Sequence, residues 1–132
     1  MLKIIPFYAA ILALLYVYLS ARTIGFRRKS RVSIGDGGDQ GLLRAIRMHA
    51  NFSEYVPLSL ILLTFVEMQA APLLFLHALG SLLLIARISH AYGISSVQAK
   101  GIFRVGGMAG TFTTITIAAI WLLNEFIVLN AA

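Results

Sequence analysis

The chain has 132 residues, of which 59% are hydrophobic and 12% charged, and its formal net charge is +6. A soluble domain usually carries about twice that charged fraction, so the composition excludes an ordinary soluble protein and predicts one membrane-embedded domain over residues 1–132. The absence of cysteine excludes disulfides, thiolate metal ligands and a cysteine nucleophile, and three scattered histidines predict no metal site.

Four apolar stretches follow one another along the chain, at residues 4–21, about 42–68, 73–89 and 105–129. Each is close to the length of about 20 residues that a helix needs to cross a membrane. The first stretch has no small-x-small cleavage site, so we interpret it as a retained helix rather than a signal peptide. The sequence therefore predicts an all-α bundle of four transmembrane helices.

Positive charges gather in two of the three connections. The first connection holds Arg22, Arg27, Arg28, Lys29 and Arg31, and the third holds Lys100 and Arg104. The turn "EMQAAP" between the second and third stretches has no Lys or Arg. Because Lys and Arg accumulate in cytoplasmic loops, we expect both termini and this turn outside and the basic loops in the cytoplasm. The same rule explains the net charge, so we expect membrane lipid but no nucleic acid as a partner.

The first connection also contains "SIGDGGDQG" at residues 33–41. This segment lacks the Gly-Lys-Ser/Thr ending of a P-loop and follows no predicted strand. We interpret it as a flexible connector in which Asp39 caps the second helix.

The second stretch begins with an unusually polar segment, "RAIRMHANFSEY", at residues 44–55. Its uninterrupted apolar part covers only residues 56–66, a helical length of about 16 Å, or roughly half the hydrocarbon thickness. Counting about 20 residues back from Glu67 reaches Met48, which places Asn51 and Glu54 at membrane depth. Ionisable side chains at that depth predict a functional site.

At about 100° per residue, the polar side chains of this segment fall within one sector of the helix. His49 points elsewhere, and Pro57 is expected to kink the helix beyond the stripe. The stripe consists of Arg44, Arg47, Asn51, Glu54 and Tyr55.

An antiparallel hairpin of the second and third helices, centred between residues 70 and 71, places Arg87 at the depth of Glu54 and His90 at that of Asn51. We predict that Arg87 approaches Glu54. Such a pair could simply lock the hairpin, but one glutamate cannot satisfy the whole stripe. Arginines bind carboxylates and a glutamate binds an ammonium, so the stripe also predicts a small zwitterionic anion at the cytoplasmic helix ends.

The segment "RAIRMHANFSEYVPL" resembles the MAPEG family, the membrane-associated proteins of eicosanoid and glutathione metabolism. The family's Arg-x3-Asn-x2-Glu pattern, followed by Tyr and proline, is matched at Arg47, Asn51, Glu54, Tyr55 and Pro57. Weaker matches are Ser20-Ala21-Arg22 and Arg87-x-x-His90. The resemblance implies a homotrimer of four-helix bundles with glutathione bound between protomers near the cytoplasmic side.

The resemblance also implies a role for each matched residue. Arg104 would hold the glutathione thiolate, although it could equally be an anchor at the membrane surface. His49 would face the ligand from a second protomer, or be an ordinary interfacial residue. A family tyrosine four residues beyond His90 falls on Ile94. The residues implied to bind glutathione are Arg22, Arg47, His49, Asn51, Glu54, Tyr55, Arg87 and His90.

The predicted function is therefore a membrane-embedded glutathione transferase or peroxidase, with glutathione as co-substrate and a lipophilic electrophile as the second substrate. One alternative is a family member that binds glutathione or lipid without turnover. Another is a small multidrug or proton-coupled transporter that uses Glu54, which the arginine stripe disfavours.

Gly106 and Gly110 form a small-xxx-small pair, which predicts close packing of the fourth helix.

Overall fold

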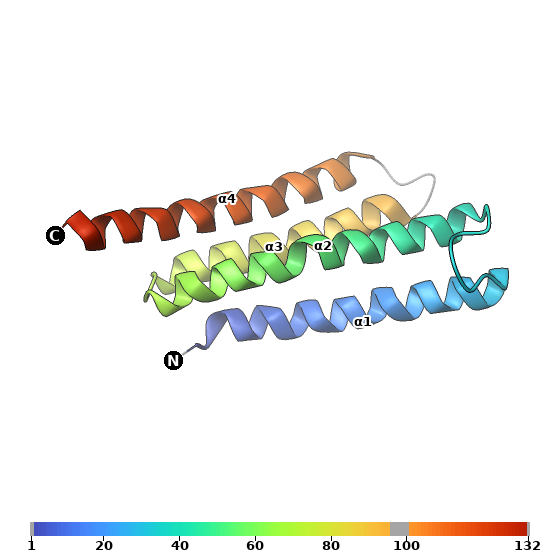
Figure 1. Cartoon of the computed structure of the whole chain (residues 1–132), viewed down its shortest axis with the longest axis horizontal. Coiled ribbons are helices and arrows are strands. Elements are labelled where there is room, and N and C mark those ends of the chain that lie inside the picture. Colours follow the sequence, from blue (N-terminus) through green and yellow to red (C-terminus); the bar gives the residue numbers. More distant parts are fainter. Residues whose placement is uncertain (1, 96–100, 132) are drawn as a thin grey trace.

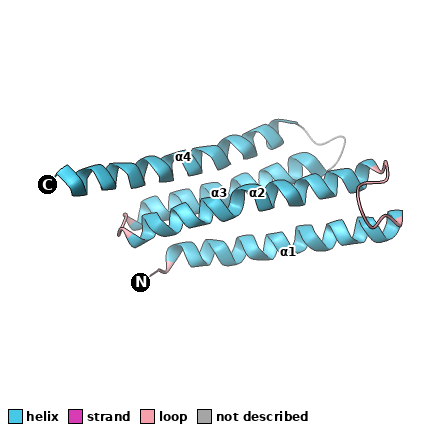
Figure 2. Cartoon of the chain, in the orientation of Figure 1, coloured by secondary structure: helices cyan, strands magenta, loops and turns pink. Residues whose placement is uncertain are grey.

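The computed structural model describes residues 2–95 and 101–131. These residues form four long helices, α1 (Ile4–Ser30), α2 (Gln40–Met68), α3 (Leu73–Ser95) and α4 (Gly101–Ala131). The helices run alternately up and down along one long axis (Figure 1). Nearly all the described chain is helical, with short loops between elements (Figure 2). The prediction of an all-α four-helix fold is confirmed.

The middle of the bundle is formed by α2 and α3. Helix α1 packs on α2 and α3 from one side, α4 packs on them from the other, and no α1–α4 contact occurs among the described residues. The core runs the length of the bundle. Its members with no exposed surface include Leu12, Leu42, Leu63, Leu83 and Ala118.

Among the described helices, α1, α3 and α4 are long and apolar enough to cross a membrane. Helix α2 has 29 residues, which is long enough, but its first half carries the polar stripe. The structure therefore supports three of the four predicted spans.

Three helices extend beyond the predicted stretches: α1 ends at Ser30 instead of residue 21, α3 ends at Ser95 instead of residue 89, and α4 begins at Gly101 instead of residue 105. Arg22, Arg27, Arg28 and Lys29 lie in the last turns of α1 rather than in a loop, and Arg104 lies in the first turn of α4. Basic side chains near the end of α1 suit the negative pole of its dipole, which explains why the helix continues past the apolar stretch. Lys100 lies outside the described residues.

We call the end of the bundle with the α1–α2 loop and the start of α4 the basic end. There Asp39 caps α2, because Asp39 Oδ1 accepts hydrogen bonds from the amides of Gly41 (2.8 Å) and Leu42 (3.1 Å). The Ser30 hydroxyl donates to Asp39 Oδ2. This hydroxyl and the helix amides lower the pKa of the Asp39 carboxyl below its ordinary value. The predicted cap is confirmed.

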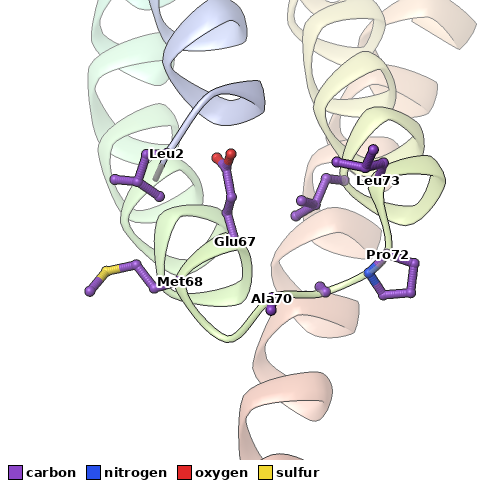
Figure 3. Close-up of a pocket in the computed structure, with 8 residues that line it drawn as sticks. Leu2, Glu67, Met68, Ala70, Pro72 and Leu73 are labelled. Atoms are coloured by element: carbon purple, nitrogen blue, oxygen red, sulfur yellow. The ribbon is translucent and has the colours of Figure 1, made fainter.

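We call the opposite end, with residues 69–72 between α2 and α3, the turn end. Glu67 caps the start of α1 there, and its carboxylate accepts the backbone amides of Lys3 (2.6 Å), Ile4 (2.8 Å) and Ile5 (2.8 Å). Figure 3 shows this carboxylate pointing to the first turn of α1, beside Leu2. Glu67 thereby fixes the start of α1 to the end of α2.

Candidate functional site

A polar cavity of about 390 Å³ opens at the basic end between α2, α3 and α4. We call it the arginine cavity. Four of the predicted site residues, from three helices, meet in it. The lining consists of Gln40, Leu43, Arg44, Arg47, Asn51, His90, Gly93, Ile94 and Arg104.

The charged side chains that line the arginine cavity have one sign. They are Arg44, Arg47 and Arg104, and none of the described lining residues is acidic. Arg47 and Arg104 are exposed, whereas Asn51 is half-buried. Guanidinium groups donate hydrogen bonds and accept none, so the cavity suits an anion with carboxylate groups.

Behind the cavity wall lies Arg87, which is only 1% exposed. Its Nη2 donates to Asn51 Oδ1 at 2.6 Å, and its Nη1 donates to Thr111 Oγ1 at 3.3 Å. The guanidinium also lies over the Phe52 ring at 5.7 Å from the ring centroid. Since the carbonyl oxygen of Asn51 accepts from Arg87, the amide nitrogen of Asn51 remains as a donor for a ligand.

The predicted approach of Arg87 to Glu54 is wrong. Arg87 binds Asn51, which lies about one helical turn before Glu54. The Asn51 side chain faces α3, where Arg87 lies, whereas the Glu54 side chain is exposed. The predicted depth of Arg87 along the bundle was correct to within one helical turn. The side chain that Arg87 contacts depends on which face of α2 is turned toward α3.

His90 joins α3 to the first turn of α4. Its Nδ1 lies 3.0 Å from the backbone carbonyl oxygen of Arg104, and the side chain is 3% exposed. Two glycines permit this approach. A Cβ on Gly107 would lie 2.6 Å from the backbone nitrogen of His90, and a Cβ on Gly93 would lie 2.4 Å from the backbone nitrogen of Arg104.

The MAPEG family model matches residues 5–124 of this chain. The chain belongs to the MAPEG family. This family includes glutathione transferases. The resemblance inferred from the second-helix motif is thereby confirmed.

Two curated relatives also match. The inner membrane protein YecN of Escherichia coli strain K12 is 35% identical over 117 residues, which span 86% of this chain and 88% of that protein. The inner membrane protein YecN of the O6:H1 strain matches with the same values. With three candidate spans, this MAPEG chain is an integral membrane protein with multiple spans.

Other motif residues of this MAPEG chain lie outside the arginine cavity. Arg22 reaches from α1 to α3, where its Nη2 donates to the Ser95 carbonyl oxygen at 3.2 Å. Its guanidinium lies over the Phe26 ring at 5.1 Å. Arg22 is therefore on another face of the single chain.

His49 points away from the polar stripe, as the helical projection predicted, and it faces α1. Its Nε2 lies 3.0 Å from Ser20 Oγ, and its ring stacks on Tyr16 at 4.8 Å between centroids. The sector prediction for His49 is confirmed.

Glu54 and Tyr55 end the polar stripe on α2. Glu54 is exposed, and Tyr55 is half-buried with its ring edge-on to Phe112 of α4, 5.5 Å between centroids. Neither residue lines the arginine cavity of one chain. The stripe therefore has a covered edge against α3 and α4 and an open edge at Arg47 and Glu54.

Several residues near the site were missed by the sequence analysis, among them Gln40 and Thr111. Gln40 lies one turn before Arg44 on the same helix face, and Thr111 lies one turn after Gly107, so helical spacing could have indicated both. The predicted Gly106–Gly110 packing pair is half correct. A Cβ on Gly110 would meet Ala86 at 2.9 Å, but one on Gly106 would meet nothing within 4 Å, because Gly106 faces away from α3.

Proposed function

We propose that this MAPEG protein is a membrane-embedded glutathione transferase or peroxidase that activates the glutathione thiol for attack on a lipophilic electrophile. The observation that carries the proposal is the arginine cavity, where Arg44, Arg47 and Arg104 meet and no described lining residue is acidic. Glutathione has two carboxylates and a thiol, and a guanidinium can bind a carboxylate through two parallel hydrogen bonds.

The roles follow from the position of each side chain. Arg47 and Arg44 hold carboxylates, and Asn51 donates its amide hydrogens to the peptide. Arg104 stands beside the sulfur and favours the thiolate. A free thiol with a pKa near 8.5 is only a few per cent thiolate at neutral pH, so a neighbouring guanidinium raises the reactive fraction.

A homotrimer would complete this site. Glu54 lies on the open edge of the stripe, while Arg22 and His49 lie on other faces of the chain. In a trimer with sites between protomers, Arg22 and His49 of one copy would reach the ligand held by the next, and Glu54 would take the ligand's ammonium. A neighbouring copy would also shield the polar half of α2 from lipid, which allows α2 to be a fourth span.

The orientation proposed for this assembly places the basic end in the cytoplasm and both termini outside. The basic side chains at the end of α1 and the start of α4 support it through the positive-inside rule. The relatives that match are inner membrane proteins by name, and we propose the same membrane for this chain. Glutathione would then enter from the cytoplasm, and the electrophile would enter through the lipid.

Two assays test the function. Purified full-length protein in detergent should bind glutathione at millimolar concentration or below, and it should conjugate glutathione to a hydrophobic chloro-nitrobenzene. Arg104→Ala should retain binding but lose most of the ultraviolet absorbance of bound thiolate. Absence of saturable binding at millimolar glutathione would contradict the proposal.

A second function is favoured by one observation. Ile94 lines the arginine cavity at the position where the family motif implies a tyrosine. A cavity without that hydroxyl suits a protein that binds glutathione without turnover. Saturable glutathione binding combined with no conjugation by wild-type protein would select this alternative.

A further inference from the structure

His90 carries a buried hydrogen-bond acceptor that the described protein leaves unpartnered. Its Nδ1 contacts the Arg104 carbonyl oxygen, and a carbonyl oxygen can only accept, so Nδ1 must bear the hydrogen. In the neutral ring Nε2 is then the unprotonated nitrogen. Nε2 is buried and has no hydrogen-bond partner among the described residues, although the His90 side chain lines the arginine cavity.

The His90 ring differs in hydrogen-bonding capacity from the side chains around it. Helix α2 presents Arg44, Arg47 and Asn51 to the cavity, and α4 presents Arg104. Arg87 lies three residues before His90 on α3, and its guanidinium binds Asn51. Because Asn51 Oδ1 is occupied by Arg87, all these side chains are hydrogen-bond donors toward the cavity. The Gln40 amide also lines the cavity and both donates and accepts, so His90 Nε2 is the basic acceptor among the described lining side chains.

The ring is held next to the proposed thiolate site. The backbone of Arg104 lies against Gly93 and against the His90 ring, because neither Gly93 nor Gly107 has a side chain that would separate α3 from α4. Arg104 therefore acts on the cavity through two of its groups. Its carbonyl fixes the tautomer of His90, and its guanidinium lines the same cavity.

Resting on the proposed function, we infer that His90 is a catalytic residue that accepts the glutathione thiol proton at Nε2. The S–H bond breaks and an N–H bond forms, giving a thiolate and an imidazolium without changing the total charge in the cavity. The thiolate lies by Arg104, and the imidazolium retains its Nδ1–H bond to the Arg104 carbonyl. When the thiolate sulfur has bonded to the electrophile, Nε2–H returns its proton to the leaving group or to the adduct.

The experiment compares full-length wild type with His90→Asn in detergent. The Asn amide can still donate to the Arg104 carbonyl, but it is not a base. Bound thiolate is measured by ultraviolet absorbance from pH 5 to pH 9, and S-methylglutathione, which has no thiol proton, reports binding alone. We expect the thiolate titration to move up by about one pH unit in His90→Asn, which lowers the thiolate fraction by up to about tenfold at pH values below the wild-type midpoint. The thiolate fraction is measured at saturating glutathione, so that any change in affinity, which S-methylglutathione reports, does not enter it.

Other outcomes separate this inference from the proposed function. An unchanged thiolate titration in His90→Asn, with binding intact, would overturn the role of His90 and leave glutathione binding standing. A large loss of S-methylglutathione affinity, with the thiolate fraction unchanged, would mean that Nε2 accepts from another ligand group and would also overturn it. No binding of either ligand by wild type would overturn both proposals. His90→Gln, which places a non-basic oxygen near the Nε2 position, must show the same thiolate loss as His90→Asn.

Discussion

The turn end and the basic end of the bundle both bring charged side chains into a largely apolar protein, but they use charge differently. At the turn end, the Glu67 carboxylate accepts the backbone amides of Lys3, Ile4 and Ile5 at the start of α1 within 2.6–2.8 Å. At the basic end, Arg44, Arg47 and Arg104 face a cavity of about 390 Å³ that has no acidic residue in its described lining. A charge whose hydrogen bonds are made within the fold stabilises it, whereas the exposed guanidinium groups of Arg47 and Arg104 can bind a ligand in the cavity.

This comparison predicts opposite responses to mutation. Removing charge at the turn end should lower stability and leave ligand binding intact. Removing charge from the arginine cavity should lower ligand affinity and leave stability intact.

The largest effect is expected for Arg47→Ala. Loss of a bidentate bond to a carboxylate should weaken glutathione binding about 100-fold, or about 2.7 kcal/mol. The thermal unfolding midpoint should not change, since the Arg47 side chain is exposed. Calorimetric titration checks the affinity, and Arg28→Ala, an exposed charge at the end of α1, is the control. Equal losses in both variants would indicate a general electrostatic effect instead of a site.

Gly107→Ala should destabilise the protein by about 2 kcal/mol, because the new Cβ would lie 2.5 Å from the Ala86 carbonyl oxygen. The helices would have to separate at His90, so glutathione binding should weaken as well. Gly106→Ala is a matched control one residue away, where a Cβ meets nothing within 4 Å. It should be neutral or stabilising by up to about 1 kcal/mol. Thermal unfolding in detergent measures both, and an equal cost at the two positions would contradict the packing described here.

Glu67→Ala should lower the free energy of unfolding by about 1.5 kcal/mol, because three amides at the start of α1 lose their acceptor. Glu67→Gln keeps one acceptor oxygen and should cost less. Denaturation followed by circular dichroism measures the stability. Glutathione affinity should be unchanged, because Glu67 is at the other end of the bundle, and a large loss of affinity would contradict the separation of the two ends.

The smallest effect is expected at Asp39, which is half-buried at the α2 cap. Its pKa is lowered in the folded protein by the Ser30 hydroxyl and the helix amides. A lowered folded pKa means that the carboxylate's contribution to stability is complete above the unfolded value of about 4 and is lost as pH falls through the folded pKa. The difference in unfolding midpoint between wild type and Asp39→Asn, which keeps the cap, should therefore be constant above about pH 4 and shrink below it. A constant difference down to pH 2 would contradict the assignment.

Much of this fold could be predicted from local sequence. Apolar runs of spanning length gave the number and order of the helices, and Asp39 before a periodic segment gave the α2 cap. The continuation of α1 to Ser30 was not predicted, because hydropathy marks the apolar part of a helix and not its end. The capping of α1 by Glu67 joins residues more than 60 positions apart, and no local pattern indicates it.

The sequence predicted how deep the site residues lie along the helices, but not which face of α2 is turned toward α3. Counting residues brought Asn51, Arg87 and His90 to similar depths, and helical spacing separated His49 from the stripe. Sequence spacing could not tell whether Arg87 meets Asn51 or Glu54, because that depends on how α2 is rotated against α3. The same limit explains why Gly106 was expected to pack where Gly107 does.

The most direct test of the central claim, that the arginine cavity binds an anion through its carboxylates, is a calorimetric comparison of glutathione with its diethyl ester on the full-length protein. The ester keeps the peptide, amine and thiol but removes both negative charges. We predict saturable binding of glutathione and at least about 100-fold weaker binding of the ester. Equal affinity for the two ligands would contradict the claim.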